Sequence, residues 1–251
     1  MNTEHIARFR FYAELNDFLP SARHHQLFDH AFNGAPAIKD TIEALGVPHT
    51  EVDLILVNGI SVGFDYHLQD GDAVSVYPVF EGLDVSGVTR LRPLPACHTA
   101  FILDVHLGKL ARLLRMAGFD CSYDNSLDDA TIISIARQEH RIILTRDIGL
   151  LKHSAVSHGY WVRSLAPVEQ AREVLQRYNL WHQVEPFRRC LVCNDLVEPV
   201  PREAAAARLP SYVMATQNAI FGCPSCHRLY WKGTHYGRMR ETLARILEPA
   251  P

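Results

Sequence analysis

Long apolar runs are absent from this chain of 251 residues, so no segment approaches the roughly 20 residues that a membrane-spanning helix needs. The first residues, MNTEHIARFRFY, also lack the apolar core of a secretory signal peptide. We therefore expect a cytoplasmic protein. Its six cysteines should then meet a reducing environment in which disulfides are disfavoured.

Basic residues are scarce in the first third of the chain. Residues 1–88 hold four Lys and Arg against 13 Asp and Glu, a net charge of −9, whereas residues 89–251 hold 21 against 15, a net charge of +6. A basic region favours polyanionic partners, although ordinary solvation of the surface is the alternative.

Residues 6–80 have the pattern of one small α+β unit. Residues 6–12 alternate, with Phe9 and Phe11 on one side, and residues 37–45 form a short helical pattern that Gly46 closes. Residues 52–57 and 73–79 read as strands. The turn signal Asn58-Gly59 follows the first of these strands, and Asp70-Gly71-Asp72 precedes the second.

The stretch from 101 to 147 reads as strand, helix, strand, helix, strand. The apolar runs 101–103 and 142–144 are short and continuous, as expected of buried parallel strands in an α/β fold. A helix after Leu107 should end at Gly118. A second should begin at Ser126, where Ser126 and Asp129 resemble a capping box.

Three aspartates follow or begin these elements: Asp104, Asp129 and Asp147. Chemistry in parallel sheets sits beyond the carboxyl ends of the strands, so the three carboxylates could converge there. Crowded carboxylates repel one another unless a cation lies between them, and Mg²⁺ or Mn²⁺ suits oxygen ligands. Alternatively, Asp129 only caps its helix and the other two are loop residues. Asp128 is the rival to Asp129, and Asp124 is a further candidate.

Basic side chains near these aspartates could hold the phosphates of a substrate. Lys109, Arg112 and Arg115 recur every three residues along the first predicted helix, and Arg146 precedes Asp147. We predict that these four bind the nucleic acid strand.

Two CxxC pairs lie near the C-terminus, Cys190 with Cys193 and Cys223 with Cys226. Each pair can supply two thiolates from one turn, and four thiolates suit a tetrahedral structural Zn²⁺. The 29 residues between the pairs exceed the usual spacing, which an inserted helix around 202–208 would explain. Disulfides and a redox CxxC are the alternatives. Cys97 and Cys121 are isolated and are expected to be buried thiols.

The sequence HRLYWKGTHYGRMR, residues 227–240, mixes His, aromatic and basic side chains around the second CxxC. Aromatic faces can stack on bases while Lys and Arg hold phosphates. Equally, Tyr230, Trp231 and His235 can pack the zinc ribbon itself.

These motifs resemble known families. The pattern DxxLGxLAxxLR at 104–115, the pair at 128–129 and IILTRD at 142–147 look like the PIN-like nuclease domain of the Mut-seven exonuclease family, and WxGTHY at 231–236 looks like its signature. Residues 6–80 resemble the β-grasp of ubiquitin and of small sulfur carriers. The Gly-Gly end of those carriers is missing, which favours a docking or scaffolding role with a protein partner.

The resemblance implies a metal-dependent ribonuclease in which Asp104, Asp129 and Asp147 hold Mg²⁺ or Mn²⁺. PIN-like nucleases often have a fourth acid after the last strand, but here Ile148-Gly149 follows. An RNA-binding adaptor with a degenerate nuclease site is therefore the alternative. A DNA exonuclease is another, since the same chemistry allows it.

Together these signals predict a multi-domain chain. A ubiquitin-like α+β β-grasp domain should occupy residues 1–86, followed by a linker over 87–98. An α/β PIN-like domain with a parallel sheet should occupy 99–183, and a small zinc ribbon 184–251.

Overall fold

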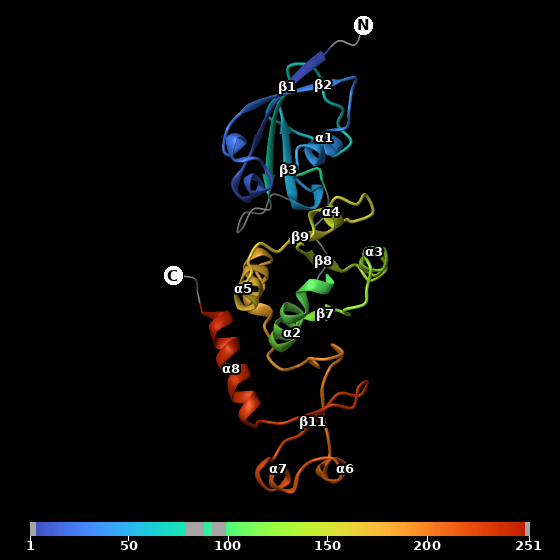
Figure 1. Cartoon of the computed structure of the whole chain (residues 1–251), viewed down its shortest axis with the longest axis vertical. Coiled ribbons are helices and arrows are strands. Elements are labelled where there is room, and N and C mark those ends of the chain that lie inside the picture. The colour runs from blue at the N-terminus through green and yellow to red at the C-terminus, as the bar shows by residue number, and fades with distance from the viewer. Residues whose placement is uncertain (1–3, 79–87, 92–98, 249–251) are drawn as a thin grey trace. The chain divides into compact units, whose positions relative to one another are not determined.

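The structure is a computed structural model that describes residues 4–78, 88–91 and 99–248 (Figure 1). The chain divides into two compact units. The first consists of the described residues before 99 together with Asp147–Trp161, and the second consists of Thr99–Arg146 with the described residues from Val162 onward. Cys97 and most of the predicted linker lie outside the described residues, so the linker boundaries stay a prediction.

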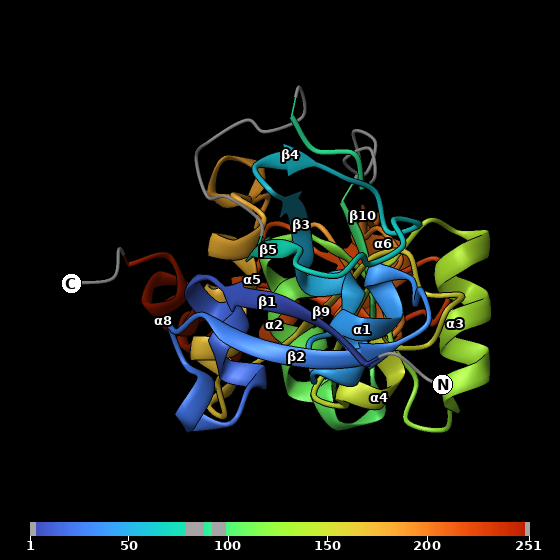
Figure 2. The ribbon, with the colours of Figure 1, turned by 90° about the horizontal axis from the view of Figure 1, so that it is seen from above.

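A five-stranded mixed sheet forms the first unit, in the order β2-β1-β5-β3-β4. Strand β1 pairs antiparallel with β2 and parallel with β5, and Figure 2 shows β1 and β2 side by side. The strands are β1 (Glu4–Phe11), β2 (Phe28–Asn33), β3 (Val52–Val57), β4 (Ile60–Ser61) and β5 (Ala73–Pro78). With helix α1 (Ile38–Ala44), this arrangement confirms the predicted ubiquitin-like fold.

The core of this unit follows from the alternation in β1. Ala7, Phe9 and Phe11 point inward and are almost fully buried, because successive side chains of a strand face opposite sides of the sheet. The hairpin between β3 and β4 is tight because Asn58 and Gly59 both adopt positive φ, 52° and 83°. These values match the turn that the Asn-Gly pair predicts.

The segment Asp147–Trp161, with helix α4 (Ile148–Leu151) and strand β9 (Gly159–Trp161), packs within this first unit. The Lys152 Nζ donates to the Glu43 carbonyl at 2.8 Å. At the far end of the segment, the centroid of the Trp161 ring lies 5.0 Å from the centroid of the Phe18 ring. The β-grasp therefore holds a segment that begins about seventy residues after its last strand. Such a long-range contact costs loop-closure entropy, which the hydrogen bonds and ring packing of the segment must offset.

Two buried polar side chains make the most specific of these contacts. The His49 Nε2 lies 2.8 Å from the Val156 carbonyl, and the Trp161 N–H donates to the Glu51 Oε1 at 2.7 Å. Both His49 and Glu51 are buried, Glu51 completely. Buried polar groups are stable only when they are hydrogen-bonded, so the 147–161 segment satisfies groups that the β-grasp would otherwise bury without these partners.

The second unit is built on parallel strands, with β6 (Ala100–Leu103) between β7 (Asp120–Ser122) and β8 (Ile142–Thr145). Both apolar runs predicted as buried strands are confirmed, since every residue of 101–103 and 142–144 is buried. Helices α2 (Gly108–Ala117), α3 (Asp129–Gln138) and α5 (Pro167–Arg177) accompany the sheet. Helix α2 ends at Gly118, as predicted, with φ +107°.

The C-terminal part of this unit contains a small three-stranded sheet in the order β10-β11-β12. Its elements are β10 (Glu198–Pro199), α6 (Arg202–Ala206), α7 (Ser211–Thr216), β11 (Phe221–Gly222), β12 (Leu229–Tyr230) and α8 (Thr234–Leu247). Helix α6 confirms the insertion expected between the two CxxC pairs. Helix α8 was not predicted; its C-terminal end lies beside α5, where the Arg172 Nη2 donates to the Arg245 carbonyl at 2.5 Å (Figure 1).

Short 3₁₀ turns complete the described chain: η1 (Ala13–Phe18), η2 (Ser21–Arg23), η3 (His49–Glu51), η4 (Val105–Leu107) and η5 (Trp181–Gln183). Within the described ranges, none of the helices combines the length and the apolar character that crossing a bilayer requires.

The buried Glu51 gives a test of the first unit. Replacing Glu51 by Ala leaves the Trp161 N–H without this acceptor, which should lower the local free energy of opening of the 147–161 segment by about 1–3 kcal/mol. Faster amide hydrogen exchange at Trp161 and its neighbours would report this change. Glu51→Gln keeps an acceptor oxygen and should exchange almost as slowly as wild type. Equal exchange in wild type and Glu51→Ala would contradict the assignment.

Candidate active site and metal centre

Asp104 is a buried carboxylate at the carboxyl end of β6. Its N–H donates to the Leu144 carbonyl at 3.0 Å, and its Oδ2 accepts a 2.7 Å hydrogen bond from the Thr145 hydroxyl. Thr145 is fully buried and ends β8. The side chain of Asp104 is therefore fixed beside the end of the neighbouring parallel strand, where α/β folds place their chemistry.

The glycine of the DxxLG pattern has a steric reason. Gly108 begins α2, and a Cβ there would lie 2.5 Å from the Tyr123 hydroxyl. That hydroxyl donates to the Val105 carbonyl at 2.9 Å, within the turn that follows Asp104. Tyr123 thus ties the chain beyond β7 to the turn beyond β6, and only glycine leaves room for it.

Helix α3 begins later than predicted. Its N-cap is Asp128, whose side chain accepts from the Thr131 N–H at 2.8 Å, so the predicted capping box of Ser126 and Asp129 is wrong. Ser126 instead donates its N–H and hydroxyl to Asp124, at 2.8 and 2.6 Å. The shorter Asp side chain at the third position explains the error, because the box relies on the reach of Glu or Gln.

These caps separate the three neighbouring acids by role. Asp128 and Asp124 are engaged in local turns, and their hydrogen bonds lower the pKa of both carboxyls. Asp129 is the first residue of α3 and is exposed, and the helix dipole favours its negative charge. Of the three, Asp129 is the one that takes no part in these local hydrogen bonds.

Asp147 belongs to the first compact unit, where it is the exposed N-cap of α4. Its Oδ1 accepts from the Gly149 N–H at 2.7 Å. Only Arg146 separates it from Thr145 in the chain, so the two Cα atoms lie within about 7.6 Å of each other, two peptide steps of 3.8 Å.

Among residues 4–78, 88–91 and 99–248, one group of three or more His, Cys, Asp or Glu side chains has its ligand atoms within 4.8 Å of one another. That group is the four cysteines of the two CxxC pairs. Of the three predicted aspartates, Asp104 and Asp129 belong to the second unit and Asp147 to the first.

The predicted substrate-binding cations divide into two kinds. Lys109 and Arg112 are exposed on α2 and can meet a phosphate. Arg115 is buried, and its prediction as a substrate ligand is wrong: its Nε and Nη2 donate to the Cys121 carbonyl at 2.9 and 2.7 Å, and its Nη1 to the Val192 carbonyl at 2.7 Å. Successive residues of a helix are about 100° apart around its axis, so two residues three positions apart differ in direction by about 60°. Arg115 is six positions after Lys109 and therefore lies about 120° around the helix from it.

Arg146 is also bound to the backbone. Its Nη1 lies within hydrogen-bond distance of the carbonyls of residues Val162, Arg163 and Ser164, at 2.8, 2.8 and 3.0 Å. The guanidinium fastens the chain after β9 to the end of β8, a structural task that the sequence pattern did not reveal.

The four cysteines meet the requirements of a zinc site. The Sγ atoms of Cys190 and Cys226 lie 3.5 Å apart, and those of Cys193 and Cys223 lie 3.2 Å apart. Both separations exceed the roughly 2.05 Å of a disulfide bond. Four free thiols at such distances fit a closed tetrahedral site, which has no open position for catalysis.

The two CxxC turns repeat one backbone geometry. In each, the N–H of the first cysteine, Cys190 or Cys223, donates to the carbonyl five residues later, at 2.7 and 2.9 Å. The carbonyl of that cysteine accepts from the N–H four residues later, at 3.0 and 2.9 Å. The residues that donate are Asn194 and His227, with φ +75° and +59°. Two unrelated sequences adopting this same turn indicate that both serve one ligand geometry.

Cys190 is prepared to act as a thiolate ligand. Burial opposes its ionisation, but hydrogen bonds from the backbone of Cys193 and Val192 and from the Tyr230 hydroxyl outweigh burial and lower the pKa of the thiol to about 6. The metal-binding form of cysteine is the thiolate, so this environment suits Cys190 as a ligand. Burial, together with hydrogen bonds from the neighbouring cysteines, instead raises the pKa of Cys193 to about 12.

Two family models match the chain. Residues 99–243 match the model of the Mut7-C RNAse domain, and residues 4–84 match that of the Mut7-C ubiquitin domain. The chain belongs to the Mut7-C RNAse domain family. Neither a curated protein nor a solved structure matches it.

In this Mut7-C RNAse domain, the first CxxC turn is fastened to the edge of the parallel sheet. The Asn194 Oδ1 accepts from the Cys121 N–H on β7 at 2.9 Å, and its Nδ2 donates to the Asp120 Oδ1 at 2.8 Å. Arg115 bonds both β7 and the turn at Val192. The metal centre and the α/β sheet therefore form one connected structure within the second unit.

Three residues with roles in this site were missed from the sequence: Thr145, Tyr123 and Asn194. Thr145 carried a signal, because it is the one hydroxyl residue in the strand IILT before Asp147. Tyr123 and Asn194 carried none, since their partners are a glycine turn and an edge strand distant in sequence.

Zinc removal tests the connection between the metal centre and the sheet. Purified protein should hold one zinc ion per chain. Removing it with a chelator should speed proteolysis around the two CxxC turns and also speed amide exchange at Cys121, since the Asn194 acceptor is lost. Re-adding zinc should restore both. Unchanged proteolysis and exchange in zinc-free protein would refute a structural role for the metal.

Proposed function

We propose that this chain is a metal-dependent ribonuclease that hydrolyses RNA phosphodiester bonds, with Asp104, Asp129 and Asp147 as the acidic residues of its active site. The observation that carries the proposal is the buried carboxylate of Asp104 at the sheet edge, held by Thr145, in a chain that contains an RNAse-family domain.

The environment of Asp104 supports a ligand role. A buried carboxylate is costly unless it is hydrogen-bonded or coordinates a cation. The Thr145 hydroxyl bonds one oxygen and so sets the orientation of the carboxylate. A preset orientation is what a metal ligand needs from the groups behind it.

Asp129 and Asp147 would complete the acidic set. Each follows a strand of the parallel sheet or begins the next helix, and carboxyl ends of parallel strands share one edge. Mg²⁺ keeps several waters and is held by only one or two carboxylates, so the three need not all touch it. A bound Mg²⁺ or Mn²⁺ would supply a reactive water and neutralise charge on the phosphate.

Lys109 and Arg112 are the substrate-binding residues that we retain. Both are exposed on α2, the helix that begins four residues after Asp104. Their charges would hold the phosphate backbone of RNA, with an affinity that falls as salt rises. We do not retain Arg115 or Arg146, whose guanidinium groups bond backbone carbonyls.

The β-grasp would help to position Asp147. Asp147 begins the segment that Glu43, His49 and Glu51 hold within the first unit. A domain that grips this segment limits the motion of its first residue. Recruitment of a protein partner remains a separate proposal for the rest of the β-grasp surface.

Neighbouring aspartates provide a matched test of the active site. Asp104→Asn and Asp129→Asn should each lower the rate of cleavage of labelled RNA in Mn²⁺ by at least about 100-fold. Losing a residue that only supports a metal ligand already lowers activity by about 10- to 100-fold, and losing a ligand itself should cost more. Asp128→Asn should stay within about 3-fold of wild type, because Asn caps a helix as well as Asp does. A gel assay, with circular dichroism to verify folding, would measure this.

The outcomes separate the candidate functions. Equal cleavage by Asp129→Asn and Asp128→Asn would remove Asp129 from the site. RNA binding without cleavage by the wild-type protein would favour the adaptor function, and faster cutting of DNA would favour the exonuclease.

The Glu51 variants test the role of the β-grasp. If it positions Asp147, Glu51→Ala should reduce the rate of cleavage several-fold, while Glu51→Gln should cut almost as well as wild type. Faster cleavage by Glu51→Ala would show instead that the contact restrains the nuclease.

A further inference from the structure

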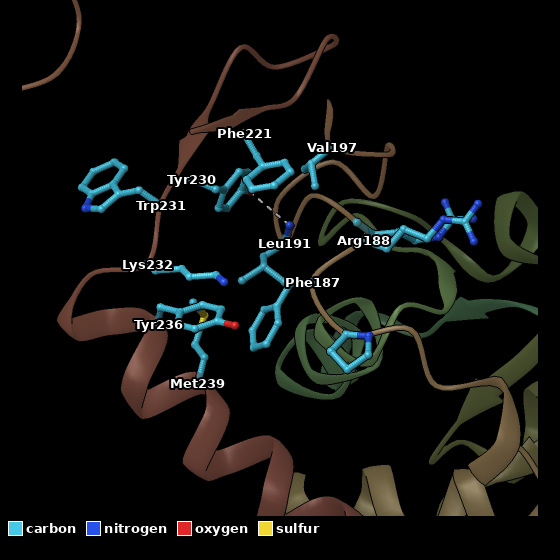
Figure 3. A pocket seen from close by; sticks show the side chains of 12 residues that line it. Phe187, Arg188, Leu191, Val197, Phe221, Tyr230, Trp231, Lys232, Tyr236 and Met239 are labelled. Atoms are coloured by element: carbon cyan, nitrogen blue, oxygen red, sulfur yellow. Dashed lines mark hydrogen bonds between the residues drawn. The ribbon is translucent and has the colours of Figure 1, made fainter. Parts of the chain in front are cut away.

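A pocket of about 410 Å³ lies beside the first CxxC turn, in the second unit (Figure 3). Its walls come from the chain before Cys190, from β11 and β12, and from the first turns of α8. The large apolar side chains that line it are Phe187, Phe221, Tyr230, Trp231, Tyr236 and Met239. Its volume lies within the range of small-molecule sites.

The aromatic side chains of this pocket are not a closed core. All five are half-buried, so each presents part of its ring to solvent. Figure 3 shows Phe221 and Tyr230 on one side and Phe187 and Tyr236 on the other, with Leu191 and Lys232 between them. Rings that face an open space can stack on a planar ligand, whereas rings that only pack the ribbon would contact one another throughout.

Phe187 is held in the pocket at a conformational cost. Its φ is +61°, a region that bulky residues rarely adopt. Its N–H donates to the Met116 carbonyl at 2.8 Å, which fixes the backbone, and its ring lies 4.8 Å from that of Tyr236 between centroids. Unfavourable backbone conformations cluster at binding sites, so this one supports a ligand role for the ring.

Two contacts shape the Tyr230 wall of the pocket and the WxGTHY motif beside it. The Tyr230 hydroxyl accepts from the Leu191 N–H at 3.2 Å and lies 3.1 Å from the Cys190 Sγ, which joins the ring to the metal centre. A Cβ on Gly233 would lie 2.9 Å from the Trp231 Nε1, so the glycine of WxGTHY lets the indole fold over the backbone. The WxGTHY motif thus shapes this pocket.

The charge of the pocket selects an anionic ligand. Lys232 Nζ lies 5.9 Å from the centre of the Tyr236 ring, and Figure 3 shows its side chain extending into the space between the rings. Arg188 pairs instead with Glu185, and its guanidinium points away. Residues 227–240 contain four Lys and Arg and no Asp or Glu.

We infer that this pocket binds a nucleobase of single-stranded RNA, stacked between the Tyr230 and Tyr236 walls, with Lys232 on its phosphate. The inference rests on the proposed ribonuclease function for the choice of RNA. Aromatic stacking accepts any base, because every base has a π-face, so the pocket would hold an unpaired strand without reading its sequence.

The test compares two strands on the full-length, zinc-loaded protein without added Mg²⁺ or Mn²⁺, so that binding is measured without cleavage. One is an unstructured RNA of about 12 nucleotides, near the site size of single-strand binding folds. The other has the same ribose-phosphate backbone but no bases. Fluorescence anisotropy should show the RNA binding at least about 5-fold more tightly, since stacking contributes about 1–3 kcal/mol per base.

Variants locate the effect. Tyr236→Leu keeps an apolar side chain but removes the ring, and should weaken RNA binding about 5- to 150-fold while leaving the baseless strand unchanged. Tyr212→Leu, at an exposed tyrosine of α7 outside the pocket, should bind like wild type. Lys232→Gln should weaken both strands and reduce the salt slope by about one. Phe221→Leu serves as a second ring deletion if Tyr236→Leu does not fold.

Equal affinity for the two strands would overturn the inference, as would wild-type RNA binding by both ring deletions. The result is independent of catalysis. Base-dependent binding by a protein that cuts nothing would keep the pocket and reject the ribonuclease, and cleavage without base-dependent binding would do the reverse.

Discussion

The buried guanidinium of Arg115 joins the parts of the second unit. It belongs to α2, bonds the carbonyl of Cys121 on β7 and reaches the first CxxC turn at Val192. Burial lowers the pKa of this guanidinium, yet the charged group is retained because several backbone acceptors surround it. The nearby carboxylate of Asp120 favours the charged form further. Removing a buried, fully bonded charge from such a junction is far more costly than losing a surface ion pair.

A common arrangement unites both units: a loop distant in sequence satisfies the polar groups of a small sheet. In the second unit, Asn194 accepts from the edge strand β7. In the first, Glu51 and His49 of the β-grasp bond the 147–161 segment. Sheets this small bury little apolar surface, so specific long-range hydrogen bonds contribute much to their definition. Both contacts also lie near proposed functional residues: Asp147 of the proposed active site in one case, and the four cysteines of the candidate structural zinc site in the other.

Strong local patterns made most of the fold predictable. The apolar runs at 101–103 and 142–144, the Asn58-Gly59 turn and Gly118 each dictate a backbone conformation through their own side chains. The errors arose where partners are remote. Arg115 was counted with Lys109 because a three-residue repeat looks like one helix face, and only its distant carbonyl partners show that it is buried. The positions of Asp104 and the cysteines were accessible from motifs, whereas Thr145, Tyr123 and Asn194 act through contacts that no local pattern encodes.

The fastening of β7 by Asn194 has a consequence for synthesis on the ribosome. The strand is made long before the cysteines that hold the loop in place, since Cys223 and Cys226 follow it by about 100 residues, or about 5–20 s of elongation. During that interval the nascent edge strand has unpaired backbone groups, which promote association with other chains. If the four cysteines hold zinc, its supply during translation should therefore affect the yield of folded protein.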